Sequence, residues 1–470
     1  MDTKEFRAEA HKMADWIADY LENIEKFPVK SQSEPGSIYS QLPELAPYSA
    51  DSMENIMKDF EEIVFPGITH WQSPNFFAYF PANSSGPSVL AEMLTAAMGT
   101  QCMIWETSPA AAELEERVLN WLRDIMGLPG SFEGVIQDTA SGATLAALIS
   151  AREKYTNFEV NRRGLYSGKK LRVYCSTQTH SSIDKAVKIA GFGIENLVKI
   201  DVDNNYALRS DLLEEQVRRD IKDGYIPCCV IVSIGTTGTT AIDPLKEIGA
   251  IAAQNNIWVH VDAALAGTAL ILPEYSWLIE GKEYIDSFVF NPHKWMFTNF
   301  DCSVYFVKDA DLLIKTFEIL PEYLKTRTRG AVNDYRDWGI PLGRRFRALK
   351  LWFVLRYYGL EKLRDMVREH ISIASGLARR IEADPHFELL APVPLNTVVF
   401  RFNPDLDDIE ELNDINRRLN HSLNDTGKIY LTHTSLQGRY VLRMVTSQTN
   451  VTEEHVAKAW ALIKELSAKI

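Results

Sequence analysis

The feature that most constrains the fold is an alternation of short apolar runs and helical segments between about residues 86 and 310. The runs LRVYCS, CCVIVS, IWVHVD and SFVF are mainly apolar, whereas THSSIDKAVKIAG and PLKEIGAIAAQNN have helical spacing. Apolar strands that alternate with helices are typical of a parallel sheet covered on both faces. The sequence therefore predicts an α/β fold with a mostly parallel central sheet.

Polar residues follow these strands at the points where each one ends. They are Thr139–Ser141, His180, Thr236–Thr237, Asp262 and Asn291–Lys294. In parallel sheets ligands bind beyond the carboxyl ends of the strands, so we expect these residues to converge. Taken singly, each has a plainer explanation: a helix cap, a salt-bridge partner, a turn or an ordinary hydrogen bond.

Lys294 stands in SFVFNPHKWMF, directly after an apolar strand and among aromatic residues. Such a lysine usually extends its amine to water along apolar surface. A desolvated lysine can instead stay neutral and form a Schiff base. Asp262 ends the preceding strand, and a buried ion pair between the two would stabilise the fold poorly. Pyridoxal phosphate would use both, because it needs a lysine for its aldehyde and an acid beside its ring nitrogen.

The other strand ends fit the same cofactor. DTASGAT at 138–144 opens a helix, and helix N-termini bind phosphate, although a Ser/Thr cap without a ligand is the commoner case. His180 could stack on a pyridine ring or only satisfy hydrogen bonds. Thr237 could reach the cofactor or only close a turn. The order of phosphate turn, histidine, aspartate and lysine favours the Schiff-base interpretation of Lys294.

Composition excludes several classes of function. The net charge is −13 and no long basic block is present, which argues against nucleic-acid and anionic-membrane partners. No run approaches 18 apolar residues, and the N-terminus lacks the apolar core of a signal peptide. The five cysteines predict reduced thiols, with no disulfide framework and no metal site. We therefore expect a cytoplasmic protein.

The 470 residues allow two to four domains, and three segments are predicted: 1–85, 86–345 and 346–470. The first begins with a helix whose apolar stripe must pack either on its own core or on a second subunit. The last combines long helices, short strands and a closing helix, which predicts a small α+β domain.

Five motifs, NPHKW, HVDAALAG, THSS, IQDTASGATL and PLGRRFRALKLWFVLR, resemble the aromatic L-amino-acid decarboxylases. These are pyridoxal-phosphate enzymes of the group II decarboxylase family, and the resemblance covers nearly the whole chain. It implies the aspartate aminotransferase fold (fold type I), with a mostly parallel seven-stranded sheet, an N-terminal helical segment and a small C-terminal domain. It also implies a homodimer in which the N-terminal helix packs on the partner subunit.

The resemblance assigns roles to residues of this chain. Lys294 would form the Schiff base, Asp262 would pair with the ring nitrogen, His180 would stack on the ring and Thr237 would lie close to it. The phosphate would be held by Ala140, Ser141, Asn291 and His293.

A mobile loop of the family corresponds to about 320–337, and its tyrosine matches Tyr323. In decarboxylases this residue is taken to return a proton to the α-carbon after CO₂ leaves, whereas relatives with Phe tend to be aldehyde synthases. Tyr323 therefore favours amine formation. The predicted function is decarboxylation of aromatic L-amino acids. The alternatives are an aldehyde synthase, a decarboxylase of another amino acid such as glutamate or histidine, and a silent relative that only binds.

The substrate ring would be bound by residues of HWQSPNFFAYFPA and by one glycine. The family positions are Trp71, Tyr79, Phe80, Pro81 and Gly343, although an aromatic run usually means core packing. Ala82, Gln101, Met103 and Leu265 depart from the residues common in the family, which leaves the preferred ring open.

Overall fold

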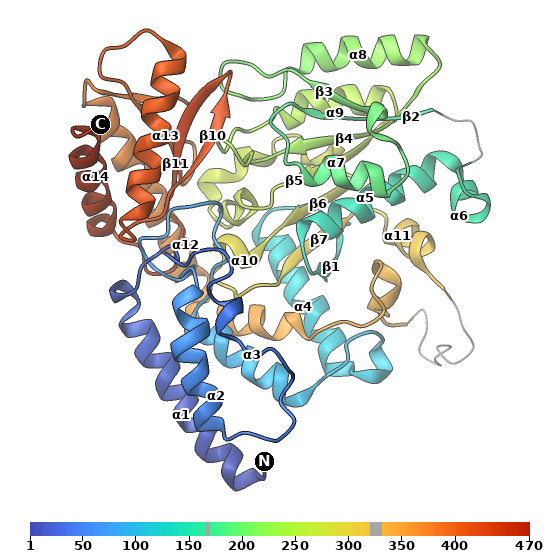
Figure 1. Ribbon diagram of the computed structural model, residues 1–470. Helices are drawn as coiled ribbons and strands as arrows, with labels where there is room; N and C mark the ends of the chain where they lie inside the picture. The colour runs from blue at the N-terminus through green and yellow to red at the C-terminus, as the bar shows by residue number, and fades with distance from the viewer. Residues whose placement is uncertain (166–169, 320–330) are drawn as a thin grey trace. The chain divides into compact units, whose positions relative to one another are not determined.

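The computed structural model describes residues 1–165, 170–319 and 331–470, and the chain forms two compact units (Figure 1). The large unit comprises Ala82–Ser372 and Ala391–Thr397; the small unit comprises Met1–Pro81, Ile373–Leu390 and Val398–Ile470. The three segments predicted from the sequence remain a prediction.

A seven-stranded sheet forms the centre of the large unit, with strand order β1-β7-β6-β5-β4-β2-β3. Only β7 runs antiparallel to its neighbours, β1 and β6, so the predicted mostly parallel sheet is confirmed. The first residue of β7 therefore lies at the edge where the other strands end. The strands are β1 (Glu133–Gln137), β2 (Leu171–Ser176), β3 (Leu197–Ile200), β4 (Ile226–Ser233), β5 (Trp258–Asp262), β6 (Ser287–Phe290) and β7 (Ser303–Val307).

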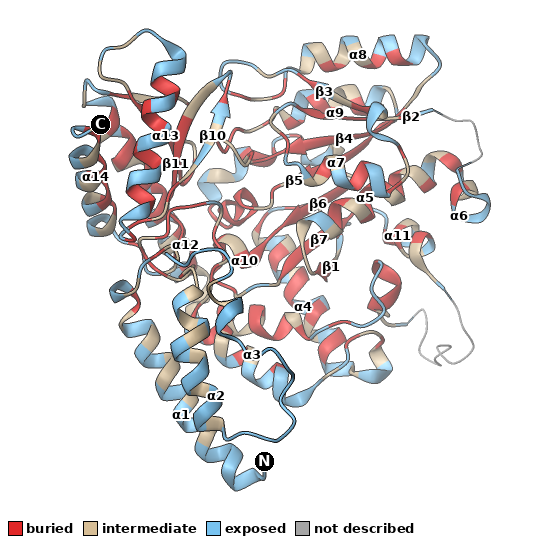
Figure 2. Cartoon of the chain, in the orientation of Figure 1, coloured by how far each residue is buried: buried red, intermediate tan, exposed pale blue. Residues whose placement is uncertain are grey.

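Helices cover both faces of this sheet, and its strands are almost wholly buried (Figure 2). Successive residues of a strand face opposite sides. Val173 of β2 packs in one apolar cluster with α5 and α7, whereas the hydroxyl of Tyr174 donates to Asp220 of α8 at 2.8 Å. The helices are α3 (Gly86–Met98), α4 (Pro109–Ile125), α5 (Ala140–Thr156), α6 (Glu159–Arg163), α7 (Ser182–Ile189), α8 (Ser210–Lys222), α9 (Leu245–Gln254), α10 (Pro292–Trp295) and α11 (Ala310–Phe317).

The small unit contains a four-stranded sheet, of order β10-β11-β9-β8, and packed helices. Its short strands and closing helix are as predicted, whereas α13 and β10 were not predicted from the sequence. In α13, Leu412, Ile415, Leu419 and Leu423 form a buried stripe at helical spacing. The elements are α1 (Thr3–Glu22), α2 (Met53–Asp59), β8 (Phe387–Leu389), β9 (Thr397–Phe402), α13 (Ile409–Asp425), β10 (Thr432–Leu436), β11 (Arg439–Val445) and α14 (Glu453–Ser467); α12 (Arg347–Glu382) contributes to both units and is interrupted at Gly359, where φ is 70°.

The N-terminal helix α1 packs only partly on its own chain. None of its residues is buried. The indole of Trp16 donates to Glu61 at 2.7 Å and lies edge-on to Phe65, whereas Phe6 and Leu21 remain 58% and 42% exposed. Part of the apolar stripe is therefore left without cover.

None of the helices in the described ranges combines the length and apolar composition that a bilayer crossing requires.

Candidate functional site

The carboxyl ends of β4, β5 and β6 bring two of the candidate residues to neighbouring positions. Asp262 pairs with Ser233 on one side and with Val289 on the other. The segments that follow β5 and β6 also stay side by side, since the N–H of Asn291 donates to the carbonyl of Ala264 at 2.9 Å. Asp262 and the turn that carries Lys294 thus lie on adjacent strand ends, as the sequence predicts.

Lys294 lies in the one-turn helix α10, held by a backbone hydrogen bond and by its buried neighbour. Its N–H donates to the carbonyl of Asn291 at 2.9 Å. The next residue, Trp295, is fully buried, and its indole donates to Nδ1 of His370 at 3.0 Å. The side chain of Lys294 is itself only half-buried. A short turn with a buried neighbour therefore presents the amine at the sheet edge.

His180 follows β2, in a turn anchored beside the end of β4. The hydroxyl of Thr179 lies 3.1 Å from that of Ser176 and accepts from Ser233 at 3.4 Å. The imidazole is exposed. Partial desolvation lowers its pKa, Asp262 opposes this shift and the charge of Lys294 adds to it. The fields of both residues therefore reach His180.

His293 is buried and its protonation state is fixed by a backbone hydrogen bond. The N–H of Cys302 donates to Nδ1 at 2.9 Å, so the ring proton is on Nε2. The ring of Phe300 packs against it with centroids 4.7 Å apart. Burial, and secondarily the charge of Lys294, lowers the pKa of His293 to about 3. His293 is therefore a neutral hydrogen-bond donor through Nε2.

Asn291 links this turn to the start of α5. Its Oδ1 accepts from the hydroxyl of Ser303 at 2.6 Å, and Ser303 pairs with Gln137, the last residue of β1. From there the chain enters the N-terminus of α5, where the hydroxyl of Thr139 accepts from the N–H of Gly142 at 3.2 Å. The N–H groups of the first helical turn, including those of Ala140 and Ser141, have no partner within the helix and attract anions.

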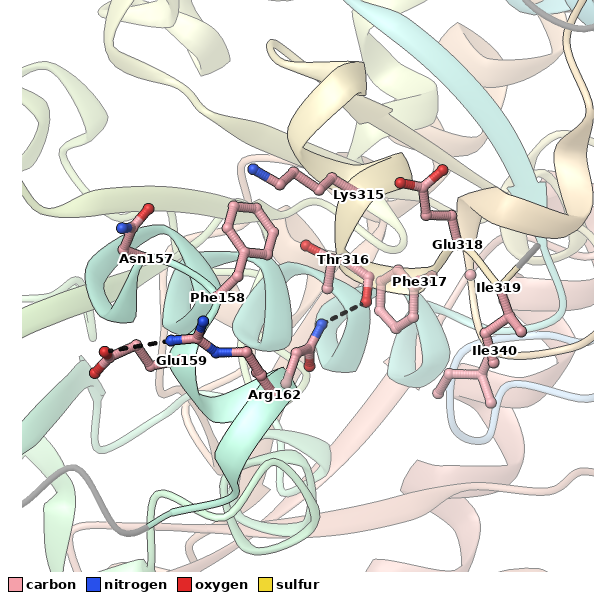
Figure 3. A pocket seen from close by; sticks show the side chains of 12 residues that line it. Asn157, Phe158, Glu159, Arg162, Lys315, Thr316, Phe317, Glu318, Ile319 and Ile340 are labelled. Carbon is pink, nitrogen blue, oxygen red and sulfur yellow. Dashed lines mark hydrogen bonds and ion pairs between the residues drawn. The ribbon is translucent and has the colours of Figure 1, made fainter.

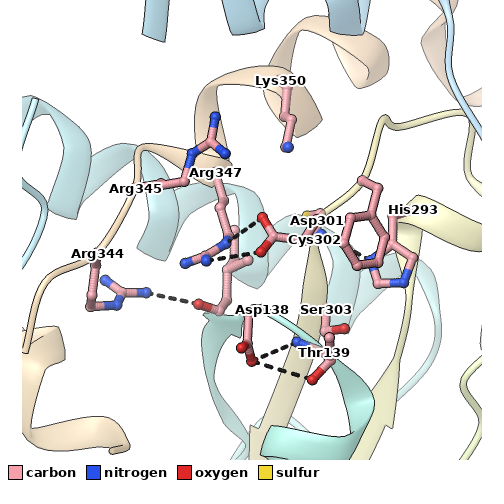
Figure 4. A network of polar contacts seen from close by, with 12 residues as sticks. Asp138, Thr139, His293, Asp301, Cys302, Ser303, Arg344, Arg345, Arg347 and Lys350 are labelled. Atoms are coloured by element: carbon pink, nitrogen blue, oxygen red, sulfur yellow. Dashed lines mark hydrogen bonds and ion pairs between the residues drawn. The ribbon is translucent and has the colours of Figure 1, made fainter. Parts of the chain in front are cut away.

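A bidentate ion pair supports the segment that contacts His293 (Figure 4). Arg347 binds both carboxylate oxygens of Asp301, at 3.0 and 3.1 Å. Burial raises the pKa of Asp301, but hydrogen bonds and charge from Arg347 outweigh this and hold it below its ordinary value. The adjoining Arg344 is likewise paired with Glu115, at 2.5 Å. This basic run therefore serves as internal support.

The residues at this edge match the chemical groups of pyridoxal phosphate. The first turn of α5, with the Ser141 hydroxyl and the neutral donors Asn291 and His293, suits a phosphate. A carboxylate suits a protonated ring nitrogen, and a lysine amine suits an aldehyde. Thr237 lies half-buried in the turn that follows β4.

The predicted aromatic substrate residues lie in the small unit and are not plain core. Trp71 stacks on Tyr79 with centroids 5.8 Å apart, yet Tyr79 is 47% exposed. The hydroxyls of Tyr79 and Tyr430 lie 3.2 Å apart, and the guanidinium of Arg443 lies 5.5 Å from the Phe80 ring centroid. Pro81, which ends this run, is buried.

Gly343 lies in the large unit, beside one of the residues that depart from the family. A Cβ on Gly343 would lie 3.3 Å from Nε2 of Gln101. The Oε1 of Gln101 accepts from the N–H of Arg344 at 2.7 Å, which fixes the amide. Tyr323 lies outside the described residues.

A cavity of about 810 Å³ lies elsewhere in the large unit (Figure 3). Phe158, Arg162, Lys315 and Phe317 are among its lining residues, and Lys315 lies 4.1 Å from the Phe158 ring centroid. Among the predicted site residues that the structure describes, none lines this cavity.

Sequence reasoning missed the residues that hold the candidate residues in place. Ser303 and Cys302 contact candidate residues, His370 contacts the neighbour of Lys294, and Arg347 binds Asp301 in the segment that packs on His293. All but His370 lie in or next to apolar or basic runs, where nothing in the local pattern marks them. Only the final three-dimensional contact reveals their role.

The comparisons with known proteins agree with this geometry. The model of the pyridoxal-dependent decarboxylase conserved domain matches residues 35–403. The chain belongs to this family. The decarboxylase is 46% identical to phenylacetaldehyde synthase of Arabidopsis thaliana, over 99% of this chain and 96% of that protein. It is 44% identical to tyrosine decarboxylase 2 of Narcissus pseudonarcissus, over 99% and 94%.

A solved structure, that of Oryza sativa TDC with PLP and tryptamine, matches the fold of the decarboxylase with a TM-score of 0.97. The two are 36% identical, and the match covers 100% of this chain and 99% of that chain. The predicted pyridoxal-phosphate fold is thereby confirmed.

Proposed function

We propose that this decarboxylase removes the carboxyl group of aromatic L-amino acids and releases the arylalkylamine and CO₂. The observation that carries the proposal is the meeting of Lys294, Asp262 and His180 at one sheet edge, next to an anion-binding helix N-terminus. Relatives named for tyrosine and tryptophan support the aromatic substrate class.

Each candidate residue has a proposed task. Lys294 would hold the aldehyde carbon of the cofactor through its amine, and Asp262 would hold the ring nitrogen in its protonated form. When bound, pyridoxal phosphate supplies a protonated ring that accepts the electron pair of the broken Cα–carboxylate bond. His180 and Thr237 would contact the ring of the bound cofactor. The phosphate is held by Ala140, Ser141, Asn291 and His293.

A second set of residues acts on the substrate in this proposal. Tyr323 returns a proton to the substrate α-carbon. The aromatic ring is contacted by Trp71, Tyr79, Phe80, Pro81 and Gly343. The exposure of Tyr79 supports a binding role over a packing role.

The homodimer and the cytoplasmic location are also part of the proposal. Apolar side chains of α1 and α3 are exposed in the single chain; Phe6, Leu21, Leu90, Met93, Leu94 and Met98 are all at least 42% exposed. Covering them against a second copy would remove this apolar surface from water. All five cysteines are free thiols, which suits a reducing compartment.

One alternative has a specific observation in its favour. The relative that is 46% identical is named a phenylacetaldehyde synthase, so amine and aldehyde must be separated by experiment. Cofactor-loaded enzyme is offered phenylalanine, tyrosine, dopa, tryptophan, 5-hydroxytryptophan, histidine and glutamate separately, and amine, aldehyde and hydrogen peroxide are quantified. We expect amine from the aromatic substrates with little peroxide.

Two variants sharpen this assay. Lys294→Ala should give no product from any substrate. Tyr323→Phe should convert part of the amine yield into aldehyde with matching peroxide. Aldehyde with stoichiometric peroxide from the unmodified enzyme would establish the alternative instead, and turnover of glutamate or histidine alone would refute the aromatic class.

A further inference from the structure

A buried histidine without a task in the proposed reaction lies on the strand that carries Asp262. His260 is fully buried in β5, and both of its ring nitrogens have partners. Nε2 lies 3.0 Å from the hydroxyl of Thr144, and Nδ1 lies 2.9 Å from that of Ser287. Burial lowers the pKa of His260 to about 4, so the ring is neutral near pH 7. The hydrogen bonds are therefore those of an uncharged imidazole.

Thr144 lies one helical turn from Ala140, and His260 lies two residues from Asp262; Ala140 and Asp262 are both proposed to bind the cofactor. On a helix, residues four apart lie on one face, and Thr144 follows Ala140 by four. On a strand, residues two apart face the same side, and His260 precedes Asp262 by two. We call the first turn of α5, with Ala140 and Ser141, the phosphate cradle. The Thr144–His260 hydrogen bond thus joins α5, one turn after the phosphate cradle, to β5, two residues before the carboxylate of Asp262.

Much of the contact between α5 and the sheet is made by small apolar side chains, with Leu148 as a larger one. The helix presents Ala143, Ala146 and Ala147, all fully buried, and small apolar side chains resist sliding weakly because they interdigitate little. A buried polar pair costs desolvation that an apolar pair would avoid. A hydrogen bond is directional, so a polar pair favours the one position of the helix relative to the strand at which its geometry is good.

We propose that the Thr144–His260 hydrogen bond is a brace that sets the spacing between the phosphate cradle of α5 and the carboxylate of Asp262. Both are then positioning residues for a ligand that spans the two anchors, with a phosphate ester at one end and a protonated ring nitrogen at the other. The inference rests on the proposed assignment of Ala140, Ser141 and Asp262 to the cofactor.

The test compares one ligand that uses both anchors with two that use one. Thr144→Val keeps the side-chain shape and removes only the hydroxyl. Dissociation constants of the apoenzyme are measured for pyridoxal phosphate, inorganic phosphate and pyridoxal. We expect affinity for pyridoxal phosphate to fall about 10-fold, the effect of one buried hydrogen bond. Affinity for phosphate and for pyridoxal should change less than about twofold, since each needs only one element in place.

Two control variants accompany this measurement. Thr144→Ser restores the hydroxyl and should restore the affinity for pyridoxal phosphate. Ser150→Ala removes another buried hydroxyl of α5, one that has no hydrogen-bond partner among the described residues, and should change nothing. The ³¹P resonance of the bound cofactor should shift in Thr144→Val and stay unchanged in Ser150→Ala.

If Thr144→Val lowered the affinity for all three ligands equally, the Thr144–His260 pair would be a general structural contact, and the proposal of a brace would be wrong. An unchanged affinity for pyridoxal phosphate would also overturn the proposal. Failure of the underlying assignment looks different: Ser141→Ala and Asp262→Asn would then leave the affinity for pyridoxal phosphate as it is in the unmodified apoenzyme.

Discussion

The indole nitrogen of Trp295 donates a hydrogen bond to Nδ1 of His370 across 3.0 Å, and both side chains are buried. Trp295 directly follows Lys294 in the one-turn helix α10, and His370 lies on α12. A helix of four residues has little stability of its own. The bond therefore ties the lysine-bearing turn to a long helix far away in the sequence.

Replacing His370 with Leu should lower the unfolding free energy of the apoenzyme by about 1 to 3 kcal/mol, because the Trp295 N–H loses its acceptor in a buried place. Release of pyridoxal phosphate should also become faster. Urea unfolding and the decay of the cofactor's visible absorbance on dilution measure the two effects. His370→Asn, whose Oδ1 can stand in for Nδ1, should recover most of both; if Asn behaves like Leu, the hydrogen bond is unimportant.

The stability of the apoenzyme should fall as the pH is lowered from about 6.5 towards 4. Burial lowers the pKa of His260 to about 4 and those of His293 and His370 to about 3, from an ordinary 6.5. In this window the unfolded chain binds three protons that the folded protein does not. Asp243 acts in the opposite direction, because burial raises its pKa from 3.8 to about 7 and the folded protein holds that proton.

For these four groups the net uptake on unfolding is about two protons, which corresponds to roughly 2 to 3 kcal/mol of stability lost per pH unit; the lowered pKa values of His70, His180 and His433 act in the same direction. Urea midpoints at fixed protein concentration between about pH 6.5 and 4.5 measure the slope. His370→Asn removes one of the three imidazoles and should lower the slope by about 1.4 kcal/mol per pH unit. A slope that is flat, or that has the opposite sign, would contradict the neutral state of the buried histidines.

Arg347→Lys should weaken both the fold and cofactor retention. Lysine cannot reproduce the two parallel hydrogen bonds to Asp301, and the pair is largely buried. We expect about 1 to 3 kcal/mol of lost stability. Arg368→Lys is the matched control, since Arg368 binds Glu274 through two hydrogen bonds at an exposed position and should be neutral. Equal effects of both substitutions would show that burial of the Asp301 pair is unimportant.

Gly343→Ser should reduce activity towards bulky rings. The new Cβ would meet Nε2 of Gln101 at 3.3 Å, and Gln101 is held by the N–H of Arg344. If Gly343 lines the substrate pocket, kcat/KM for tryptophan should fall about 10- to 100-fold, with a smaller change for histidine. The double variant Gln101→Ala, Gly343→Ser relieves the crowding and should recover part of the loss. An unchanged ratio of tryptophan to histidine would remove Gly343 from the pocket.

The fold of the large unit was largely predictable, because mainly apolar strands and helical segments differ in period and length. The antiparallel direction of β7 could not be predicted from the sequence. Its sequence, SVYFV, is as uniformly buried as the parallel strands. Strand direction depends on the connection, and here it contains only the one-turn helix α10, which is too short to cross back over the sheet.

The positions of Asp262, Asn291, His293 and Lys294 followed from the rule that strand ends converge in a parallel sheet. The residues that support them did not follow, because hydrogen bonds such as Trp295–His370 join segments whose proximity depends on the whole fold. In β5 one signal was available: His260 interrupts an apolar strand two residues before Asp262, on the same face.

The antiparallel course of β7 has a consequence for the order in which the protein folds. β6, the lysine turn and β7 form a local hairpin of low contact order, which can assemble early. The pairing of β1 with β7 joins Glu133 to Val307, across most of the large unit's sequence, and must close a long loop. The phosphate cradle follows β1. During refolding, the amides of the β6–β7 hairpin should therefore be protected from hydrogen exchange before the protein can bind pyridoxal phosphate. Added cofactor should not speed the formation of its own binding site.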